Sequence, residues 1–280
     1  MQLARAKVNL WLNVVGHRAD GYHLLHSLAA FSDLVDTLAA EPSDGLSLAV
    51  DGPGAEALAD ETDNLVLKAA RRLAGHAGVA PRAALRLTKR IPVAAGLGGG
   101  SADAAATLTA LVDLWRLALP VEELFDLAAA LGADVPMCLA GRASIVSGVG
   151  ERLEPAPPLP ACAILLVNPG IALPTSEVFG ARRGEFSVAQ PVMRPWNDLA
   201  EFVAALARRG NDLADAAISL RPTIADVLAF LWQSPRARYA AMSGSGATCF
   251  ALYETLSAAE QAARGVPAAW WRHAGLLAST

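Results

Sequence analysis

The sequence predicts an α+β fold, because strand-like and helical patterns are both abundant but do not alternate regularly along the chain. Hydrophobic residues make up 54% of the 280 positions and charged residues 18%, a composition typical of folded proteins rather than disordered ones. The sequence shows no internal repeat. A chain of this length can bury a sizeable core, and two joined domains are its most natural arrangement.

In the first half of the chain, short apolar runs predict strands and amphipathic periods predict helices. The predicted elements are strands at 8–15, 46–54, 83–92 and 143–153, and helices at 64–78, 101–119 and 121–132. Asn64 and Gly78 fit the cap and the stop of their helix, and Pro120 closes the helix that begins near Ser101. Asp20-Gly21 is a turn signal.

In the second half, a proline-rich stretch at 155–162 precedes a buried strand at 163–170. We place the domain boundary there, giving an N-terminal domain of residues 1–155 and a C-terminal domain of residues 156–280, although these prolines also fit a rigid crossover within one fold. Helices are predicted at 198–209 and 222–233. A glycine turn at 243–246 leads into a strand, and an alanine-rich helix follows.

Charge and cysteine content exclude several classes of function. The formal net charge is −4, and no cluster of Lys or Arg marks a nucleic-acid-binding face. The three cysteines show no C-x-x-C spacing and fit reduced thiols in the cytoplasm, and the five histidines lack zinc-ligand spacing. Mean hydropathy is +0.35, yet charged residues or prolines interrupt every apolar run before it could span a bilayer, and we expect no signal peptide.

The run "GLGGGS", residues 96–101, indicates a phosphate-binding loop. Its missing side chains allow several backbone N–H groups to turn toward one point, and the helix that follows adds its unpaired N–H groups and the positive end of its dipole. The spacing fits neither a Walker A loop, in which a lysine would replace Gly100, nor G-x-G-x-x-G. The alternatives are a linker or a close packing contact, but a linker would be polar.

Other candidate residues are ambiguous when taken singly. Lys7 could be a solvated strand end. Asp134 fits either the N-cap of a helix, with Pro136 in its first turn, or a catalytic carboxylate. "DGYH" (residues 20–23) and "SGSG" (243–246) could contact a ligand or simply form turns.

Together the motifs resemble those of the GHMP small-molecule kinases. The segments that carry the resemblance are "AKVNLWLNVVGHRADGYHLLHSL", "PVAAGLGGGSADAAATL" and "MSGSGATCFALY". They occur in the expected order, and the resemblance extends from about Ala4 to Tyr253. "RADGYH", "LGADVPMCLAGRASIVSGVGERL" and "NDLADAAISLRPTIADVL" narrow it to the members that phosphorylate a CDP-linked methylerythritol in the non-mevalonate isoprenoid pathway.

The resemblance implies a two-domain fold, with an N-terminal domain like ribosomal protein S5 and a ferredoxin-like C-terminal domain. It implies an ATP-dependent kinase that uses Mg²⁺ with ligands not identifiable from the sequence, and that is cytoplasmic and a monomer or weak homodimer. Lys7 and Asp134 would be the catalytic pair, with Asp134 as general base and Lys7 keeping it ionised. The loop would bind ATP through Pro92, Ala95, Gly96, Leu97, Gly98, Gly99, Gly100, Ser101 and Ala102.

The resemblance also implies a substrate site. Tyr22 would stack on the cytosine, His23 would hydrogen-bond the base, and Phe179 would cover its opposite face. Asn9 would lie beside the substrate, and Thr175, Ser243 and Gly244 are weaker candidates.

Two positions depart from the pattern of many relatives. Ala102 stands where a second serine is common, which leaves magnesium contacts less certain, and Ala214 stands where an acidic residue is common. Two alternative functions stay open at this point. One is a non-catalytic ligand sensor, disfavoured by the presence of Asp134, and the other is a sibling kinase for mevalonate-type or homoserine-like substrates, which would lack the aromatic cytosine set.

Overall fold

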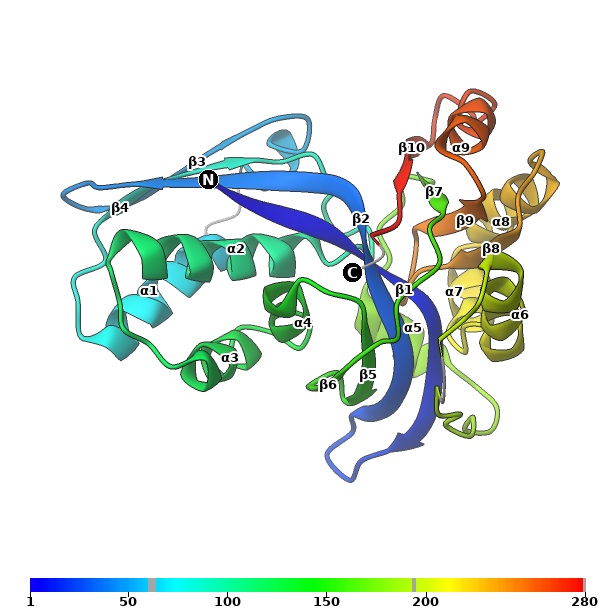
Figure 1. The fold of residues 1–280 in the computed structure, drawn as a ribbon, viewed down its shortest axis with the longest axis horizontal. Coiled ribbons are helices and arrows are strands. Elements are labelled where there is room, and N and C mark those ends of the chain that lie inside the picture. The colour runs from blue at the N-terminus through cyan, green and yellow to red at the C-terminus, as the bar shows by residue number, and fades with distance from the viewer. Residues whose placement is uncertain (60–63, 193–194, 279–280) are drawn as a thin grey trace. The chain divides into compact units, whose positions relative to one another are not determined.

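The computed structural model describes residues 1–59, 64–192 and 195–278, and it confirms the α+β class (Figure 1). The strands are β1 (Gln2–His17), β2 (His23–Glu41), β3 (Leu46–Asp51), β4 (Ala83–Thr88), β5 (Ser144–Gly148), β6 (Arg152–Pro155), β7 (Ala163–Asn168), β8 (Tyr239–Met242), β9 (Cys249–Tyr253) and β10 (Trp271–Leu276). The helices are α1 (Leu65–Ala77), α2 (Gly99–Leu114), α3 (Val121–Ala129), α4 (Val135–Ala140), α5 (Thr175–Ala181), α6 (Leu199–Arg209), α7 (Ala214–Leu220), α8 (Thr223–Gln233) and α9 (Leu256–Ala263), with a 3₁₀ turn, η1, at Glu56–Leu58.

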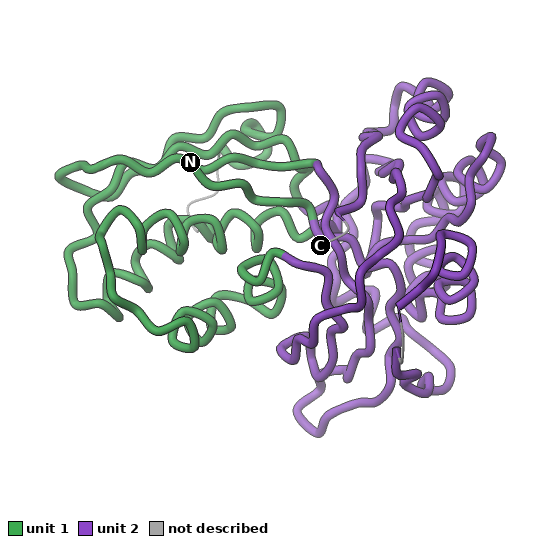
Figure 2. Tube along the Cα trace, in the orientation of Figure 1, with its two compact units in different colours: residues 1–6, 34–93, 98–141 green, residues 7–33, 94–97, 142–280 purple. Residues whose placement is uncertain are grey.

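The chain forms two compact units, and it passes between them several times (Figure 2). Unit 1 contains residues 1–6, 34–93 and 98–141, and unit 2 contains residues 7–33, 94–97 and 142–280. The long strands β1 and β2 each contribute to both units. A domain boundary between residues 155 and 156 stays a prediction.

In unit 1, the C-terminal part of β2 pairs antiparallel with β4, and β3 pairs parallel with β4. Alternate residues of β4 are buried, as expected for a strand with one face on the core. Helices α1 and α2 pack against each other, and their apolar residues join strand residues such as Leu38 and Leu87 in one hydrophobic cluster. This packing holds the first turn of α2, where the glycine loop ends.

In unit 2, β7 lies between β9 and β10 in an antiparallel sheet, with β8 on the other side of β9. Every residue of β7 is buried, which agrees with its continuous apolar sequence. The N-terminal part of β2 pairs with β5, which pairs with β6. Residues of α8, α9 and the sheet form the second hydrophobic cluster.

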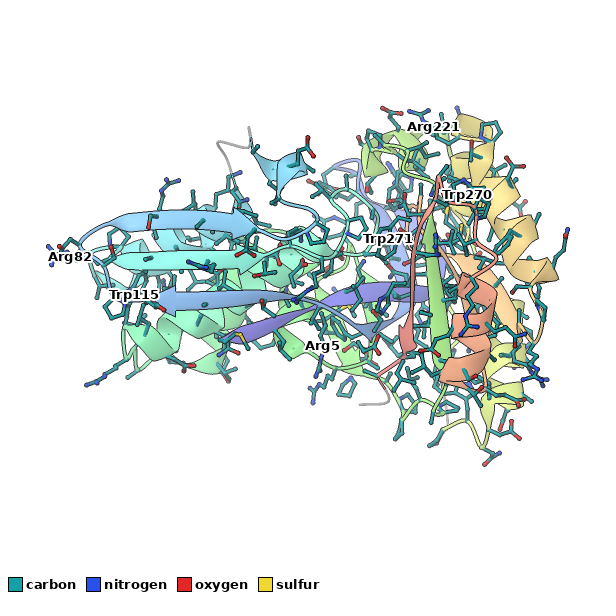
Figure 3. The ribbon with its side chains drawn as sticks, turned by 90° about the horizontal axis from the view of Figure 1, so that it is seen from above. Arg5, Arg82, Trp115, Arg221, Trp270 and Trp271 are labelled. Carbon is teal, nitrogen blue, oxygen red and sulfur yellow. The ribbon has the colours of Figure 1, made fainter. Side chains whose placement is uncertain are left out.

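Helix α1 confirms both of its predicted caps. The Asn64 side chain accepts a hydrogen bond from the Val66 N–H, and Gly78 ends the helix in the left-handed conformation. The predicted end of the next helix is wrong. Helix α2 stops at Leu114 rather than Leu119, because Arg116 has φ +51°, and the indole of Trp115 donates to the Arg82 carbonyl at 3.0 Å (Figure 3).

Two other elements end earlier than predicted, and two strands were not predicted. Helix α3 ends at Ala129, three residues before the predicted stop near Gly132, and β4 ends at Thr88 rather than at Pro92. Strands β2 and β10 have no clear sequence signal, since polar and charged residues interrupt the apolar positions of both. Within the described ranges, no helix is both long enough and apolar enough to cross a membrane.

Candidate functional site

The glycine loop ends where α2 begins. Gly96 and Gly98 have φ of +74° and +64°, a conformation that side-chain-bearing residues rarely adopt, so glycine is favoured at both positions. Gly98 occupies the N-cap of α2, and no side chain caps the helix there. The N–H groups of the first turn, at Gly99, Gly100 and Ser101, are therefore oriented as in anion-binding helix N-termini.

The three consecutive glycines of the loop have different surroundings. At Gly99 a Cβ atom would lie 2.9 Å from the ammonium nitrogen of Lys89, so this glycine permits close packing. At Gly100 a Cβ would have no atom within 4 Å and the residue is exposed, so protein packing gives no reason for this glycine. An absent side chain at this exposed position leaves room for a ligand.

Ala102, where many relatives of the predicted family have serine, is 2% exposed and packs in the core of unit 1. Its N–H donates to the Gly98 carbonyl at 2.9 Å, as an ordinary helical bond. Ser101, the preceding residue, is half-buried and supplies the hydroxyl of this first turn. Pro92, at the other end of the loop, is also half-buried.

In unit 2, residues 95–97 of the loop pack against the "SGSG" turn. A Cβ on Gly96 would meet the Gly246 carbonyl oxygen at 2.3 Å, and the Thr248 hydroxyl donates to the Ala95 carbonyl. The Lys7 N–H donates to the Leu97 carbonyl at 2.8 Å. The second glycine motif therefore supports the first, because only glycine allows the two backbones to approach this closely.

A buried polar network connects β1 to the same turn. The Lys7 ammonium donates to the Asn9 Oδ1 at 2.9 Å, and the Asn9 Nδ2 donates to the Ser27 hydroxyl at 2.8 Å. The Asn9 N–H donates to the Ser243 hydroxyl oxygen at 3.0 Å. A Cβ on Gly244 would lie 3.1 Å from the Asn9 Oδ1. The structure thus brings together four predicted site residues: Lys7, Asn9, Ser243 and Gly244.

Asn211 belongs to this region, although sequence reasoning did not select it as a site residue. Its Nδ2 donates to the carbonyls of Met242 and Gly244, each at 2.8 Å, and its Oδ1 accepts from the Leu213 N–H. A single amide side chain therefore fixes both sides of the glycine turn. The sequence segment that begins "NDLADAAISL" contains this residue, but there it indicated only the resemblance to a family.

The aromatic candidates and Thr175 also lie in unit 2. The His23 ring lies 5.0 Å from the Phe179 ring centroid with 32° between the planes, and His17 meets His23 edge-on. Partial burial lowers the pKa of His23, and the charges of His17 and Arg182 lower it further, so its imidazole is neutral at pH 7. Tyr22 is 63% exposed, and the Thr175 hydroxyl contacts that of Ser245 at 2.9 Å.

Asp134 lies in unit 1, at the N-cap position of α4, with Pro136 in the first turn of that helix. Its backbone carbonyl accepts from the Cys138 N–H at 3.1 Å, but its side chain makes no capping hydrogen bond. The structure therefore confirms the cap position, but the carboxylate makes no capping hydrogen bond there. Asp134 is half-buried. The other member of the predicted catalytic pair, Lys7, belongs to unit 2.

Family models match two parts of the chain. Residues 64–142 match "GHMP kinases N terminal domain" and residues 191–272 match "GHMP kinases C terminal". The 4-diphosphocytidyl-2-C-methyl-D-erythritol kinase of Rhodospirillum rubrum is 52% identical over 99% of this chain and 92% of its own length. The chain belongs to the GHMP kinases. Within them it belongs to the family of 4-diphosphocytidyl-2-C-methyl-D-erythritol kinases, and it is an ATP-dependent phosphotransferase.

Further relatives agree with this GHMP kinase assignment. The kinase of the same name from Paramagnetospirillum magneticum is 52% identical over 96% of this chain and 95% of its own length. A crystal structure titled 4-(cytidine 5'-diphospho)-2C-methyl-D-erythritol kinase is 38% identical, covers 99% of both chains and has a TM-score of 0.82. The homoserine kinase of Cytophaga hutchinsonii shares the fold, with a TM-score of 0.71. It is 18% identical, and the match covers 99% of this chain and 94% of that chain. The predicted two-domain GHMP kinase fold is confirmed.

Proposed function

We propose that this chain transfers the γ-phosphoryl group of ATP to the 2-hydroxyl of 4-diphosphocytidyl-2-C-methyl-D-erythritol, a step of the non-mevalonate isoprenoid pathway. The observation that carries the proposal is the 52% identity, over 99% of the chain, to a kinase of that name. The sequence also has Tyr22, His23 and Phe179 at the positions that the family resemblance assigns to the cytosine of the substrate.

The ATP phosphates would bind at the N-terminus of α2. Gly98, Gly99, Gly100 and Ser101 would present backbone N–H groups, and the helix dipole would favour the negative charge. Pro92 and residues 95–97 would form the rest of the loop, and Ala102 would pack beneath it. The uncapped helix start and the open space at Gly100 support this assignment.

In the chemical step, Asp134 would accept the proton of the substrate 2-hydroxyl as general base. The hydroxyl oxygen would form the new bond to the γ-phosphorus while the bond to the bridging oxygen breaks, and ADP would leave with that electron pair. Lys7 would offset the negative charge on the transferring group. One observation supports the role of Lys7: its ammonium is buried and donates to the Asn9 Oδ1.

The cytosine would lie between the rings of Tyr22 and Phe179, with His23 hydrogen-bonded to its edge. A neutral imidazole suits this role because it carries one donor and one acceptor. Asn9 would lie beside the substrate, and Thr175, Ser243 and Gly244 would line the site. The contact between the His23 and Phe179 rings supports a shared location for two members of this set.

Mg²⁺ accompanies ATP in the proposed reaction and would neutralise charge on its β- and γ-phosphates. Within the described ranges, no group of three or more His, Cys, Asp or Glu residues is arranged to hold a metal ion. Mg²⁺ would therefore bind mainly through the substrate phosphates and water, as it often does in proteins. Ser101 is the loop hydroxyl that would reach it, since Ala102 offers none.

A cytoplasmic location and a monomeric or weakly dimeric state are further proposals. Burial raises the pKa of the Cys162 thiol to about 12, and it also raises the pKa of Cys249. Both thiols would therefore remain protonated and unreactive, as suits a reducing compartment.

A coupled ADP-release assay tests the proposed substrate. The wild-type chain should release ADP with 4-diphosphocytidyl-2-C-methyl-D-erythritol at least about a hundredfold faster, by kcat/KM, than with mevalonate or homoserine. Equal rates with all three acceptors, or a preference for either of the others, would overturn the assignment. ADP release without any acceptor measures the background hydrolysis.

A further inference from the structure

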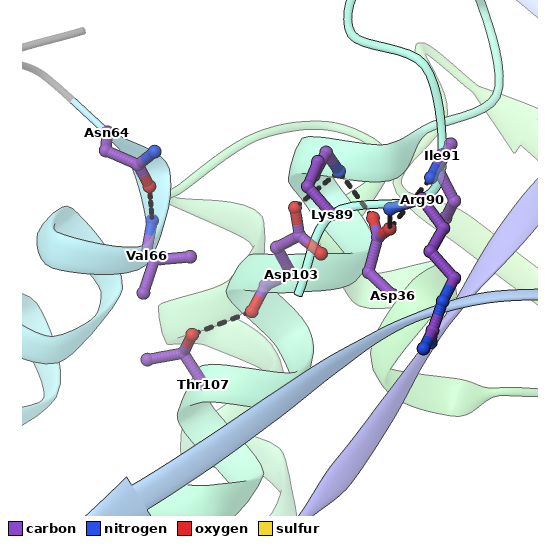
Figure 4. A network of polar contacts seen from close by, with 8 residues as sticks. All are labelled: Asp36, Asn64, Val66, Lys89, Arg90, Ile91, Asp103 and Thr107. Atoms are coloured by element: carbon purple, nitrogen blue, oxygen red, sulfur yellow. Dashed lines mark hydrogen bonds and ion pairs between the residues drawn. The ribbon is translucent and has the colours of Figure 1, made fainter. Parts of the chain in front are cut away.

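Three charged side chains are buried together in unit 1, and the reaction described above uses none of them. Lys89 follows β4, Asp36 lies on β2 and Asp103 lies on α2, and their side chains are 3%, 0% and 3% exposed. The Lys89 ammonium lies 2.5 Å from the Asp36 Oδ2 and 2.7 Å from the Asp103 Oδ2 (Figure 4). Burying ions costs several kcal/mol each before pairing, and apolar side chains would often stabilise a core as well.

The contacts of this cluster converge on the start of the glycine loop. The Asp36 Oδ1 accepts from the N–H groups of Arg90 and Ile91, at 2.5 and 2.8 Å, and these residues immediately precede Pro92 (Figure 4). The backbone of Lys89 is also held, because its N–H donates to the Asp51 carbonyl at 2.8 Å. The chain therefore enters the loop from a fixed backbone.

The same cluster contacts the far end of the loop. Asp103 is in the second turn of α2 and ties that helix to the Lys89 ammonium. A Cβ on Gly99, the first residue of α2, would lie 2.9 Å from the Lys89 nitrogen and 3.0 Å from the Ile91 Cγ2. Asp36, Lys89 and Asp103 thus connect the residues before the loop with the helix turn after it.

The cluster contains one ammonium group and two carboxyl groups. Burial raises the pKa of Asp103 to about 7, opposed by the charge of Lys89 and reinforced by the neighbouring carboxylate of Asp36. Within the described residues, the Asp103 Oδ1 has no hydrogen-bond partner, which fits a carboxyl group that holds a proton part of the time. The Lys89 ammonium, within 2.7 Å of both carboxyl groups, offsets part of their negative charge near the first turn of α2.

We propose that Lys89, Asp36 and Asp103 act together as positioning residues that fix the N-terminus of α2 relative to the start of the glycine loop, so that its N–H groups point at the ATP phosphates. They act through the backbone of Arg90, Ile91 and Gly99 rather than by touching ATP. This inference rests on the proposed role of the loop. It predicts that damage to the cluster weakens ATP binding specifically, and leaves binding of the phosphoryl acceptor unchanged.

Steady-state kinetics of Asp103→Leu and Asp103→Asn test the proposal, with ATP and acceptor varied separately. Asp103→Leu should raise KM for ATP by about tenfold or more, since misplaced binding groups are costly, and leave KM for the acceptor within about twofold. Asp103→Asn can still accept from Lys89 and should restore most of the ATP affinity. Thr107→Val, one turn further along α2, is the matched control and should leave both KM values unchanged, because the Thr107 hydroxyl donates to the Asp103 carbonyl within the same helix.

A purely structural cluster would give another result. Asp103→Leu would then lower the active fraction of the enzyme, and hence the apparent kcat, with both KM values unchanged, and this would overturn the proposal. If Asp103→Leu is insoluble, Asp36→Asn decides, because its amide cannot accept from both Lys89 and the loop N–H groups. An unchanged KM for ATP in Asp36→Asn would equally overturn it. A wild-type chain that neither binds ATP nor releases ADP would instead contradict the proposed function.

Discussion

At the scale of single residues, Asp134 shows what a structure adds to a motif. The sequence allows a helix cap or a catalytic base, and both place an aspartate just before a proline in a first turn. In the fold the residue is at the N-cap position, yet its side chain does not cap α4. The carboxylate therefore gives α4 no capping hydrogen bond, and its catalytic role stays a prediction.

Asp134→Asn should reduce kcat by about a hundredfold or more, because the amide cannot accept the hydroxyl proton. Its dissociation constant for ATP, measured by equilibrium binding, should stay within about twofold of the wild type. A mutant with near-normal turnover would remove Asp134 as the base.

Tyr22→Ala should raise KM for the CDP-linked substrate by about tenfold or more, through loss of stacking on the cytosine, and leave KM for ATP almost unchanged. The side chain is 63% exposed, so its removal should not disturb folding. Tyr22→Phe is the matched control and should bind the substrate nearly as well as the wild type. Equal increases of both KM values would argue against stacking.

His23 gives the substrate site a predicted pH dependence. Its pKa is lowered from 6.5, chiefly by burial, so the ring is neutral at pH 7 and gains a proton only in more acidic solution. If the neutral ring accepts a hydrogen bond from the base, KM for the CDP-linked substrate should rise as pH falls below about 6.5. His23→Gln should flatten this rise. The same rise in His23→Gln would assign the titration to another group.

At the scale of elements, the glycine loop separates glycines that serve packing from one that leaves room for a ligand. Gly96 has a positive φ and faces the Gly246 carbonyl. Gly100 has ordinary helical geometry and nothing near its missing Cβ. In the sequence, residues 96–100 predict one phosphate-binding loop, because the residue type alone does not distinguish a packing role from a binding role.

Gly96→Ala and Gly100→Ala form a matched pair that distinguishes these roles. Gly96→Ala should lower the melting temperature by several degrees, because its Cβ would clash with fixed backbone at 2.3 Å. Gly100→Ala should melt like the wild type but bind ATP about tenfold more weakly, if the phosphates occupy the open space beside it. Normal ATP affinity in Gly100→Ala would contradict phosphate binding at that residue.

At the scale of the whole molecule, the buried carboxyl of Asp103 links stability to pH. Its pKa is 3.8 when the side chain is unperturbed, as in the unfolded chain, and about 7 in the folded protein. Between these pH values only the folded chain holds the proton. The contribution of Asp103 to the free energy of unfolding is therefore complete below pH 3.8, falls as pH rises toward 7, and is constant above that.

Urea unfolding of the wild type and of Asp103→Asn, at several pH values between 4 and 8, measures this contribution. The wild type should lose stability relative to Asp103→Asn as pH rises through that window, because the asparagine does not titrate. Parallel stability curves for the two proteins would show that Asp103 does not hold its proton in the folded state.

The α+β class, the helix α1 with both of its caps, and the family can be predicted from the sequence, because they depend on periodicity and on short motifs that are contiguous in the chain. The folded chain is needed to see that Asn211 holds the "SGSG" turn and that Lys89 contacts Asp36 and Asp103, which are 53 and 14 residues away. A single charged or amide residue gives no periodic pattern from which its partner could be predicted. Its partner is set by the fold, because a polar group that is buried without a hydrogen bond destabilises the protein.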